Sequence, residues 1–126
     1  MTDSRSPARS SRPLVVCVGE ILWDCFPDRK VLGGAPLNCA YMAQSVGAQA
    51  LPVSRIGDDD DGRAILAVMK EKGLDASRIQ VDSDRPTGTV RVALSPQGEP
   101  TFTIVEEVAY DYLAWDEGLR DPLARC

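Results

Sequence analysis

The stretch GGAPLNCAYMAQSVG, residues 33–47, places two glycines and a proline directly before a segment that is apolar on almost every side. Adjacent glycines let the backbone adopt a positive φ and approach another group without a Cβ in the way. Pro36 presets a helical φ at a first-turn position, where no amide donor is needed. The pattern predicts a tight loop followed at once by a helix that is buried on more than one side.

Apolar runs on either side of this helix predict two strands. Leu14–Val18 is a continuous run rich in β-branched residues and ends at Gly19, as is typical of a parallel strand covered on both faces. The run 50–56 lies one helix length further on and ends at Gly57, although Pro52 removes one ladder donor. Strand, helix and strand predict a βαβ unit, so the expected fold class is α/β.

A second helix is predicted in DDDDGRAILAVMKEKG, residues 58–73. Acidic residues crowd its start, Lys70 and Lys72 lie near its end, and Gly73 follows as a stop, which matches the helix dipole at both ends. We interpret the acidic cluster 58–61 as capping and dipole compensation. A metal site is not expected there, because the alternating ligands and closing Glu of an EF-hand are missing.

After the second helix the apolar period changes from about four to two. Apolar side chains alternate with polar or small ones from Thr87 to Leu94, residues 96–98 supply a turn, and a second run returns. The segment 87–106 is therefore predicted to be a hairpin with one wet face, outside the main sheet. A short helix is expected around residues 115–125.

Composition excludes several classes of partner and site. The net charge of −5 argues against nucleic acid, whose phosphates need clustered Lys and Arg, and no apolar run approaches the roughly 20 residues that span a membrane. The chain has no His and no CxxC pair, so a zinc site is not expected. Cys17, Cys25 and Cys39 are expected to be buried and reduced, which fits a cytoplasmic location. Residues 1–12, rich in Ser, Arg and Pro, are expected to form a disordered tail before a domain at 13–126.

Asn38 is the polar residue that stands out near the start of the first helix. Its amide could both donate to and accept from the hydroxyls of a polyol. A structural role is the alternative, in which Gly33 and Gly34 make a tight turn and Asn38 caps the helix. The residues alone leave both interpretations open.

Residues 33–57 resemble the first signature of the PfkB, or ribokinase-like, carbohydrate kinases. The matching positions are Gly-Gly, a small residue or Pro, then Asn38, Ala40, Gly47 and Gly57 at the expected spacing. The order of the other segments agrees as well: GE followed by an Asp, RIGDDDDGR, PTGTVRVAL and TFTIVEE. The loop reads GGAP rather than GGKG, which is similar to fructokinase-type members.

The resemblance implies the amino-terminal part of a ribokinase-like doubly wound sheet, with the hairpin 87–106 as part of a small β lid that closes over a sugar. The residues it implies for sugar binding are Asp24, Gly33, Gly34, Asn38, Ile104 and Glu106. Asp24 would accept bonds from sugar hydroxyls, and Ile104 and Glu106 would contact the sugar from the lid. Trp23 and Tyr110 could stack on a sugar face, although packing is the more frequent role of such aromatics.

The resemblance also implies ATP and Mg for the full-length enzyme, which transfers a phosphoryl group to a sugar hydroxyl. The family's late GAGD-like segment, with its general base and anion hole, and a GxxxxGK loop are not found in these 126 residues. No catalytic, cofactor-binding or metal-binding residue is therefore assigned. We expect the sugar-binding half of a fructokinase-like kinase, inactive alone, without the carboxy-terminal nucleotide-binding half.

Two further expectations concern alternatives and assembly. A non-catalytic sugar-binding or interaction module is the alternative function. A dinucleotide-binding half is disfavoured, because GEILWD after the first strand lacks the required glycine spacing. A homodimer through the lid or an exposed sheet edge is also expected, since unpaired strand edges pair readily with other chains.

Overall fold

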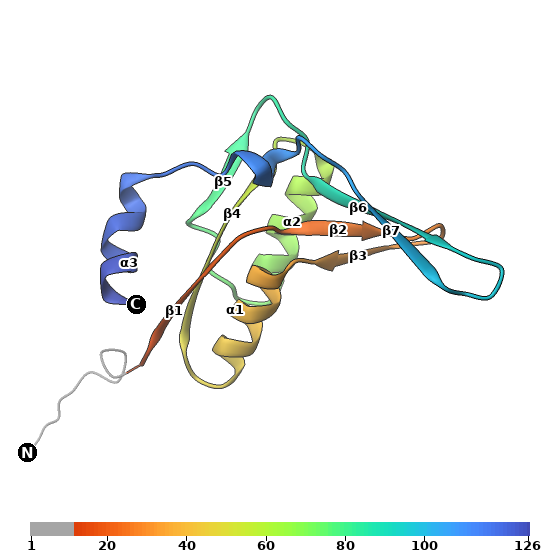
Figure 1. Cartoon of the computed structure of the whole chain (residues 1–126). Coiled ribbons are helices and arrows are strands. Elements are labelled where there is room, and N and C mark those ends of the chain that lie inside the picture. The colour runs from red at the N-terminus through yellow and green to blue at the C-terminus, as the bar shows by residue number, and fades with distance from the viewer. Residues whose placement is uncertain (1–11) are drawn as a thin grey trace, which may run out of the picture.

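The computed structural model describes residues 12–126, which form two β-sheets, three α-helices and two short 3-10 helices (Figure 1). The strands are β1 (Leu14–Val18), β2 (Leu22–Cys25), β3 (Lys30–Gly33), β4 (Gln49–Gly57), β5 (Ile79–Asp82), β6 (Gly88–Leu94) and β7 (Pro100–Ile104). The α-helices are α1 (Ala35–Ser45), α2 (Asp60–Glu71) and α3 (Arg120–Arg125), and the 3-10 helices span Ala109–Tyr112 and Glu117–Leu119. The α/β class is confirmed. The expected tail lies outside the described residues, apart from Arg12.

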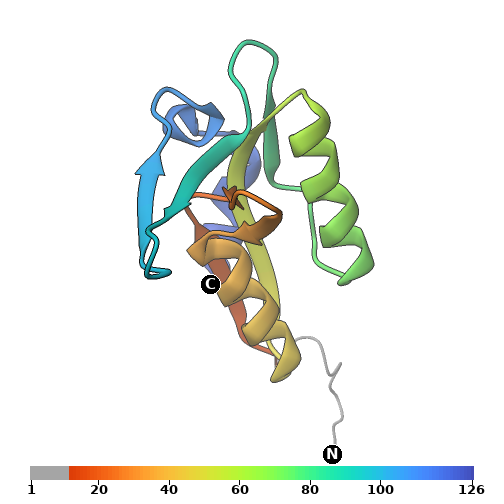
Figure 2. The same cartoon turned by 90° about the vertical axis from the view of Figure 1, so that its right-hand side faces the viewer.

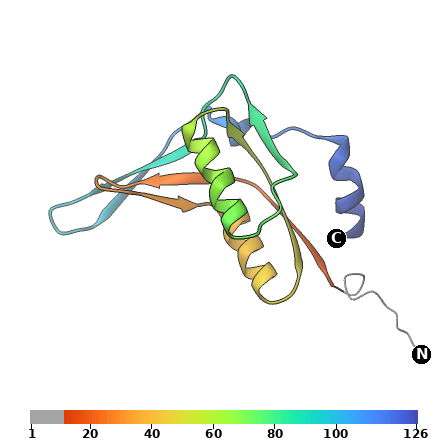
Figure 3. The same ribbon diagram turned by 180° about the vertical axis from the view of Figure 1, so that it is seen from behind.

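The main sheet is parallel, with strand order β1-β4-β5. Side chains alternate along β4, so Ala50 and Ile56 join the core under α1 and α2, whereas Leu51 and Val53 pack with Leu119 on the other face. Figures 2 and 3 show α1 and α2 on the same side of this sheet and α3 on the other side. The expected βαβ unit β1-α1-β4 is present.

The second sheet has strand order β3-β2-β6-β7 and projects from the body as a lid (Figure 1). The hairpin β6-β7 lies outside the main sheet, as its alternating pattern predicts. Strand β2 joins the two parts of the lid, because it pairs antiparallel with β3 and parallel with β6. The chain therefore reaches the lid directly from β1, through a turn at residues 19–21.

Helix α1 differs from its expectation in two ways. Its buried side chains are those of Pro36, Leu37 and Ala40, whereas Met42 and Val46 are exposed, so one face is buried and not all of it. The reason is that, among the residues described, the packing on α1 comes from β1, β4 and α2, which lie to one side. The capping role considered for Asn38 was also wrong, because the N-cap is Gly34 and no side chain caps this end.

Two smaller expectations are refined. Cys17 is buried and Cys25 half-buried, but Cys39 lies on the exposed side of α1, so its expected burial was wrong. The expected helix at 115–125 divides into the 3-10 turn Glu117–Leu119 and α3. No helix within residues 12–126 combines the length and apolarity needed to cross a bilayer.

Candidate functional site

The glycine pair lies against the chain's own turn between β1 and β2. Gly34 has φ 109°, which favours glycine, and a side chain there would overlap the carbonyl oxygen of Glu20. This close approach fixes where the backbone leaves β1 and therefore where Glu20 and the start of β2 lie. The conformational freedom of Gly34 thus serves an internal contact.

Gly33 leaves room for the carboxylate of Asp24. Leu22 and Asp24 alternate with Trp23 on β2, and Leu22 pairs directly with Gly33 on β3, so Leu22, Asp24 and the α-carbon of Gly33 share one face. An ideal Cβ at position 33 would stand 2.8 Å from Asp24 Oδ2. Two residues expected at the sugar site, Asp24 and Gly33, are therefore in direct contact.

Asp24 lies in a row of residues that crosses the lid. It pairs with Val31 on β3 and with Val90 on β6, and Val90 pairs with Ile104 on β7. Residues directly opposite each other in a sheet point to the same face, and neighbouring strands lie about 4.8 Å apart. Asp24 and Ile104 therefore share a face, roughly 10 Å apart across two strand spacings.

The Asp24 carboxylate is half-buried, and no hydrogen-bond donor of residues 12–126 contacts it. Two other partly or fully buried carboxylates are fully used inside the fold. Asp59 accepts from the Gly62 amide at 2.8 Å and from the Thr87 amide and hydroxyl at 2.9 and 2.6 Å. Asp82 accepts from Arg55 Nε at 3.0 Å and from the amides of residues 84 and 85. Within residues 12–126, Asp24 is thus an acceptor with unused capacity.

The hydrogen bonds of these two structural carboxylates also set their pKa values. Burial acts to raise the pKa of Asp59, but the bonds from Thr87 and Gly62 outweigh it and hold that pKa below its ordinary value. The pKa of Asp82 is lowered by its bond from the Asp84 amide and by Arg55. Asp59 is the N-cap of α2, so the capping role expected within the acidic cluster 58–61 is confirmed for this residue.

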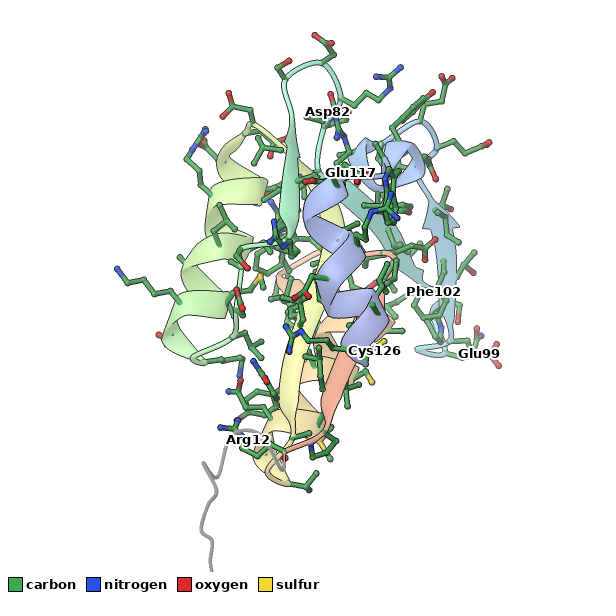
Figure 4. All side chains as sticks on the ribbon, turned by 90° about the vertical axis from the view of Figure 1, so that its left-hand side faces the viewer. Arg12, Asp82, Glu99, Phe102, Glu117 and Cys126 are labelled. Atoms are coloured by element: carbon green, nitrogen blue, oxygen red, sulfur yellow. The ribbon has the colours of Figure 1, made fainter. Side chains whose placement is uncertain are left out.

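A pocket of about 400 Å³ opens at the base of the lid, where β7 runs into the 3-10 helix Ala109–Tyr112. Its lining residues are Glu20, Ile104, Val105, Glu106, Glu107, Tyr110, Asp111 and Tyr112. The structure therefore brings Ile104 and Glu106, both expected at the lid side of the site, to one pocket. On the outer part of the same hairpin, Phe102 and Glu99 lie across the molecule from α2 (Figure 4).

Glu20 is a pocket residue for which the sequence suggested no role. It is the Glu of the GE pair after the first strand, which was part of the recognised pattern, but nothing in the spacing indicated that it would face the segment 104–112. Burial raises the pKa of Tyr110, and the nearby carboxylates of Glu20 and Asp111 raise it further. Tyr110 therefore keeps its proton at neutral pH.

Asn38 lies elsewhere. It is exposed on α1 and lines a groove of about 210 Å³ with Leu32, Leu37, Tyr41, Val68 and Lys72, between α1 and α2. Leu32 pairs with Trp23 and lies on the face of the lid opposite to Asp24 and Gly33. The structure does not bring Asn38 next to Asp24, and its role in sugar binding stays a prediction.

Trp23 also points away from Asp24. Its ring packs against the core under α2, and its indole Nε1 donates to the carbonyl oxygen of Asp61 at 3.0 Å. The neighbouring Lys30 bonds to the Asp61 carboxylate, which ties the lid to α2 a second time. Trp23 thus holds the lid to the body, and the packing alternative applies to it.

Two features of residues 12–126 bear on the Mg and ATP implied for the full-length enzyme. No three His, Cys, Asp or Glu side chains within residues 12–126 gather in a way that would hold a metal ion. The glycine pair faces Glu20 and Asp24, whose carbonyl and carboxylate oxygens repel a phosphate. We therefore assign no residue of this segment to Mg or ATP.

Known proteins are similar to this chain in sequence and in fold. Fructokinase-1 of Zea mays is 32% identical over 116 residues, which cover 82% of this chain and 36% of that protein. The crystal structure of fructokinase from Vibrio cholerae O395 superposes with a TM-score of 0.72 at 29% identity, covering 79% of this chain and 36% of the other. A fructokinase structure from Xylella fastidiosa with bound ATP superposes with a TM-score of 0.73 at 25% identity, covering 86% and 36%.

These comparisons define both the family and the extent of the match. The chain spans a little over a third of the length of these relatives. The family described as pfkB family carbohydrate kinase matches residues 13–123, nearly the whole chain. The fold is similar to that of solved fructokinases, and because the family match covers nearly the whole chain, the chain belongs to the pfkB family of carbohydrate kinases.

Proposed function

We propose that this chain is the sugar-binding part of an ATP-dependent carbohydrate kinase and that it binds a neutral monosaccharide of the fructose type on the Asp24 face of the lid. The observation that carries this proposal is the unused Asp24 carboxylate beside the bare backbone of Gly33. A carboxylate offers two acceptor oxygens, which suit a pair of adjacent sugar hydroxyls. Gly33 leaves the space that the Asp24 carboxylate occupies, and Gly34 holds the turn that carries Glu20.

The other expected residues supply the far side of the site. Ile104 lies two strands from Asp24 on the same face and borders the pocket that contains Glu106. An aliphatic side chain suits the apolar face of a sugar ring, and a carboxylate suits its hydroxyls. Together with Asp24 they would bracket a ligand of monosaccharide size.

Phosphoryl transfer is proposed for the whole kinase and not for this segment alone. In the whole kinase, bound ATP would supply the γ-phosphoryl group, and Mg²⁺ would neutralise charge on the phosphate oxygens. None of residues 12–126 is assigned to either, so we expect the purified chain to bind sugar without turnover. ATP- and fructose-dependent release of ADP by this chain would contradict that expectation.

We also propose a homodimer formed through the lid. Phe102 is 60% exposed on the hairpin, and large exposed apolar side chains favour burial against a partner. Analytical ultracentrifugation should show a dimer that Phe102→Asp shifts toward monomer. A dimer that survives this change would indicate pairing at the open edge of β1 instead.

The four free cysteines fit the reducing cytoplasm, where we place the protein.

Calorimetric titration of fructose, ribose and adenosine tests the sugar site. Asp24→Asn keeps the size of the side chain and removes its charge, so fructose should bind about tenfold more weakly or worse. Asp28→Asn is the control, because Asp28 is exposed in the turn after β2 and pairs with Arg29. Asn38→Ala, run in parallel, decides whether Asn38 takes part. Equal heats from wild type and Asp24→Asn would remove Asp24 from the site.

A further inference from the structure

Two polar groups to which no described residue is hydrogen-bonded line the pocket below the lid. The Tyr110 hydroxyl is buried and has no hydrogen-bond partner among the described residues. No donor of residues 12–126 contacts the carboxylate of Glu20, which borders the same pocket. Buried polar groups are almost always paired in folded proteins, so an unpaired hydroxyl at a pocket indicates a missing partner.

Tyr110 is held firmly by its surroundings. Its side chain is 7% exposed and packs with Leu22, Val90 and Val108, and its ring lies so close to Gly88 that a side chain at position 88 would overlap it. Leu22 and Val90 lie on the face of the lid that carries Asp24. Tyr110 therefore lies on the same face of the lid as the proposed sugar site, and its ring has little freedom to turn elsewhere.

Glu20 is fixed from its backbone. The carbonyl of Glu20 lies against Gly34, so the residue cannot move without displacing the start of α1. Its carboxylate is exposed and close enough to raise the pKa of the Tyr110 hydroxyl, although burial is the larger cause. A protonated phenol donates and a carboxylate accepts, so together they can hold one hydroxyl through both its oxygen and its hydrogen.

The charge of the pocket limits which ligand can enter. Four carboxylate residues border it, namely Glu20, Glu106, Glu107 and Asp111, and its lining includes no Lys or Arg. Arg85 stacks on the ring of Tyr112 at 3.4 Å and lies 3.9 Å from the Asp82 carboxylate, so its charge is partly offset. Such a pocket favours uncharged hydroxyl groups and repels phosphate.

We propose that Tyr110 and Glu20 bind one hydroxyl group of a neutral polyol, with Tyr110 donating to its oxygen and Glu20 accepting its hydrogen, and that the surrounding carboxylates exclude phosphorylated sugars. The inference rests on the proposed function, because it assumes that the sugar lies on the Asp24 face. It assigns to Tyr110 a hydrogen-bonding role in place of ring stacking.

Tyr110→Phe is the direct test, because it removes the hydroxyl and keeps the ring against Gly88. Fructose should bind about tenfold more weakly by calorimetry. The thermal midpoint of the free protein should stay the same or rise, since the substitution removes an unpaired buried hydroxyl. Tyr112→Phe is the matched control, because Tyr112 borders the same pocket but already bonds to Glu107 at 3.3 Å. Equal affinity in wild type and Tyr110→Phe would overturn the proposal.

The charge selection is tested with fructose and fructose 6-phosphate at low salt. Wild type should bind fructose 6-phosphate at least about tenfold more weakly than fructose. Glu20→Gln should reduce this ratio of affinities. Glu99→Gln, on the outer hairpin, should leave the ratio unchanged. Equal affinity of wild type for the two sugars would contradict the proposed exclusion of phosphorylated sugars. If Asp24→Asn weakens fructose binding while Tyr110→Phe keeps the wild-type affinity, this inference fails and the proposed function stands. If wild type binds no fructose, both fail.

Discussion

The carboxylate of Asp24 lies against the α-carbon of Gly33, where an ideal Cβ would stand 2.8 Å from its Oδ2 atom. The next residue, Gly34, meets the backbone of Glu20 and Ile21 instead, at φ 109°. Two adjacent glycines thus face a movable side-chain end in one case and fixed backbone in the other. Alanine at the two positions should therefore have different consequences.

Gly33→Ala is expected to weaken sugar binding while leaving the fold intact. The Asp24 carboxylate can rotate away from a new methyl group, so the free energy of unfolding should fall by less than about 1 kcal/mol. The displaced carboxylate should cost roughly tenfold in fructose affinity. Urea unfolding and calorimetric titration of the same sample measure both quantities. A large loss of stability together with full affinity would contradict this account of Gly33.

Gly34→Ala is expected to destabilise the fold itself. A positive φ costs a residue with a Cβ on the order of 1–3 kcal/mol, and the overlap with the Glu20 carbonyl adds to it, so a total of about 3 kcal/mol or more is expected in urea unfolding. Gly47→Ala is the control, because Gly47 has φ 99° but open space around its α-carbon. A similar loss for both variants would show that the contact with Glu20 is unimportant.

The sequence predicted those elements whose signal is local. The period of the apolar residues indicated β1, α1, β4 and the hairpin, and the charges at both ends indicated α2. Strand β2 was missed because four residues, LWDC, are too short for a period, and their pairing with β6 depends on residues more than sixty positions away. The contact between Tyr110 and Gly88 is likewise long-range and has no sequence signal.

For the candidate site, it was harder to predict which side chains of an element would be buried or would face the site. An apolar sequence around α1 predicted burial on several sides, but the described part of the chain covers one side, which leaves Cys39 and Asn38 exposed. Asp24 was identified through the family pattern, whereas its contact with Gly33 follows from the pairing of β2 with β3. The position of Glu20 at the pocket could not be predicted, because it depends on the packing of the segment 104–112 against the turn after β1.

Asp59 is expected to stabilise the fold in a pH-dependent way. Asp59→Ala removes the N-cap of α2 and the bonds to Thr87, which should lower the free energy of unfolding at pH 7 by about 2 kcal/mol. Because the folded-state pKa of Asp59 lies below its ordinary value of 3.8, the folded protein binds fewer protons there. This contribution is complete above about pH 4 and is lost as the pH falls through the lower folded-state value.

The pH dependence separates Asp59 from its neighbours. The difference in unfolding free energy between wild type and Asp59→Ala should shrink on acidification below pH 4, as measured by urea unfolding at several pH values. Asp58→Ala is the control, because Asp58 makes an exposed ion pair with Arg63 and should change stability by less than about 1 kcal/mol. A difference that stays constant down to pH 2 would rule out the ionised Asp59 as the cause.

The cysteines are expected to react according to burial. Burial raises the pKa of Cys17 to about 11, with a further contribution from the neighbouring Cys39 thiol, so Cys17 carries little of the nucleophilic thiolate at neutral pH. Iodoacetamide at pH 7.5 should alkylate the exposed Cys39 and Cys126 first, as followed by mass spectrometry, and all four cysteines should react in guanidinium. Cys39→Ser should leave Cys17 protected, because burial is the larger cause. Native Cys17 that reacts as fast as Cys126 would mean that β1 is open to solvent.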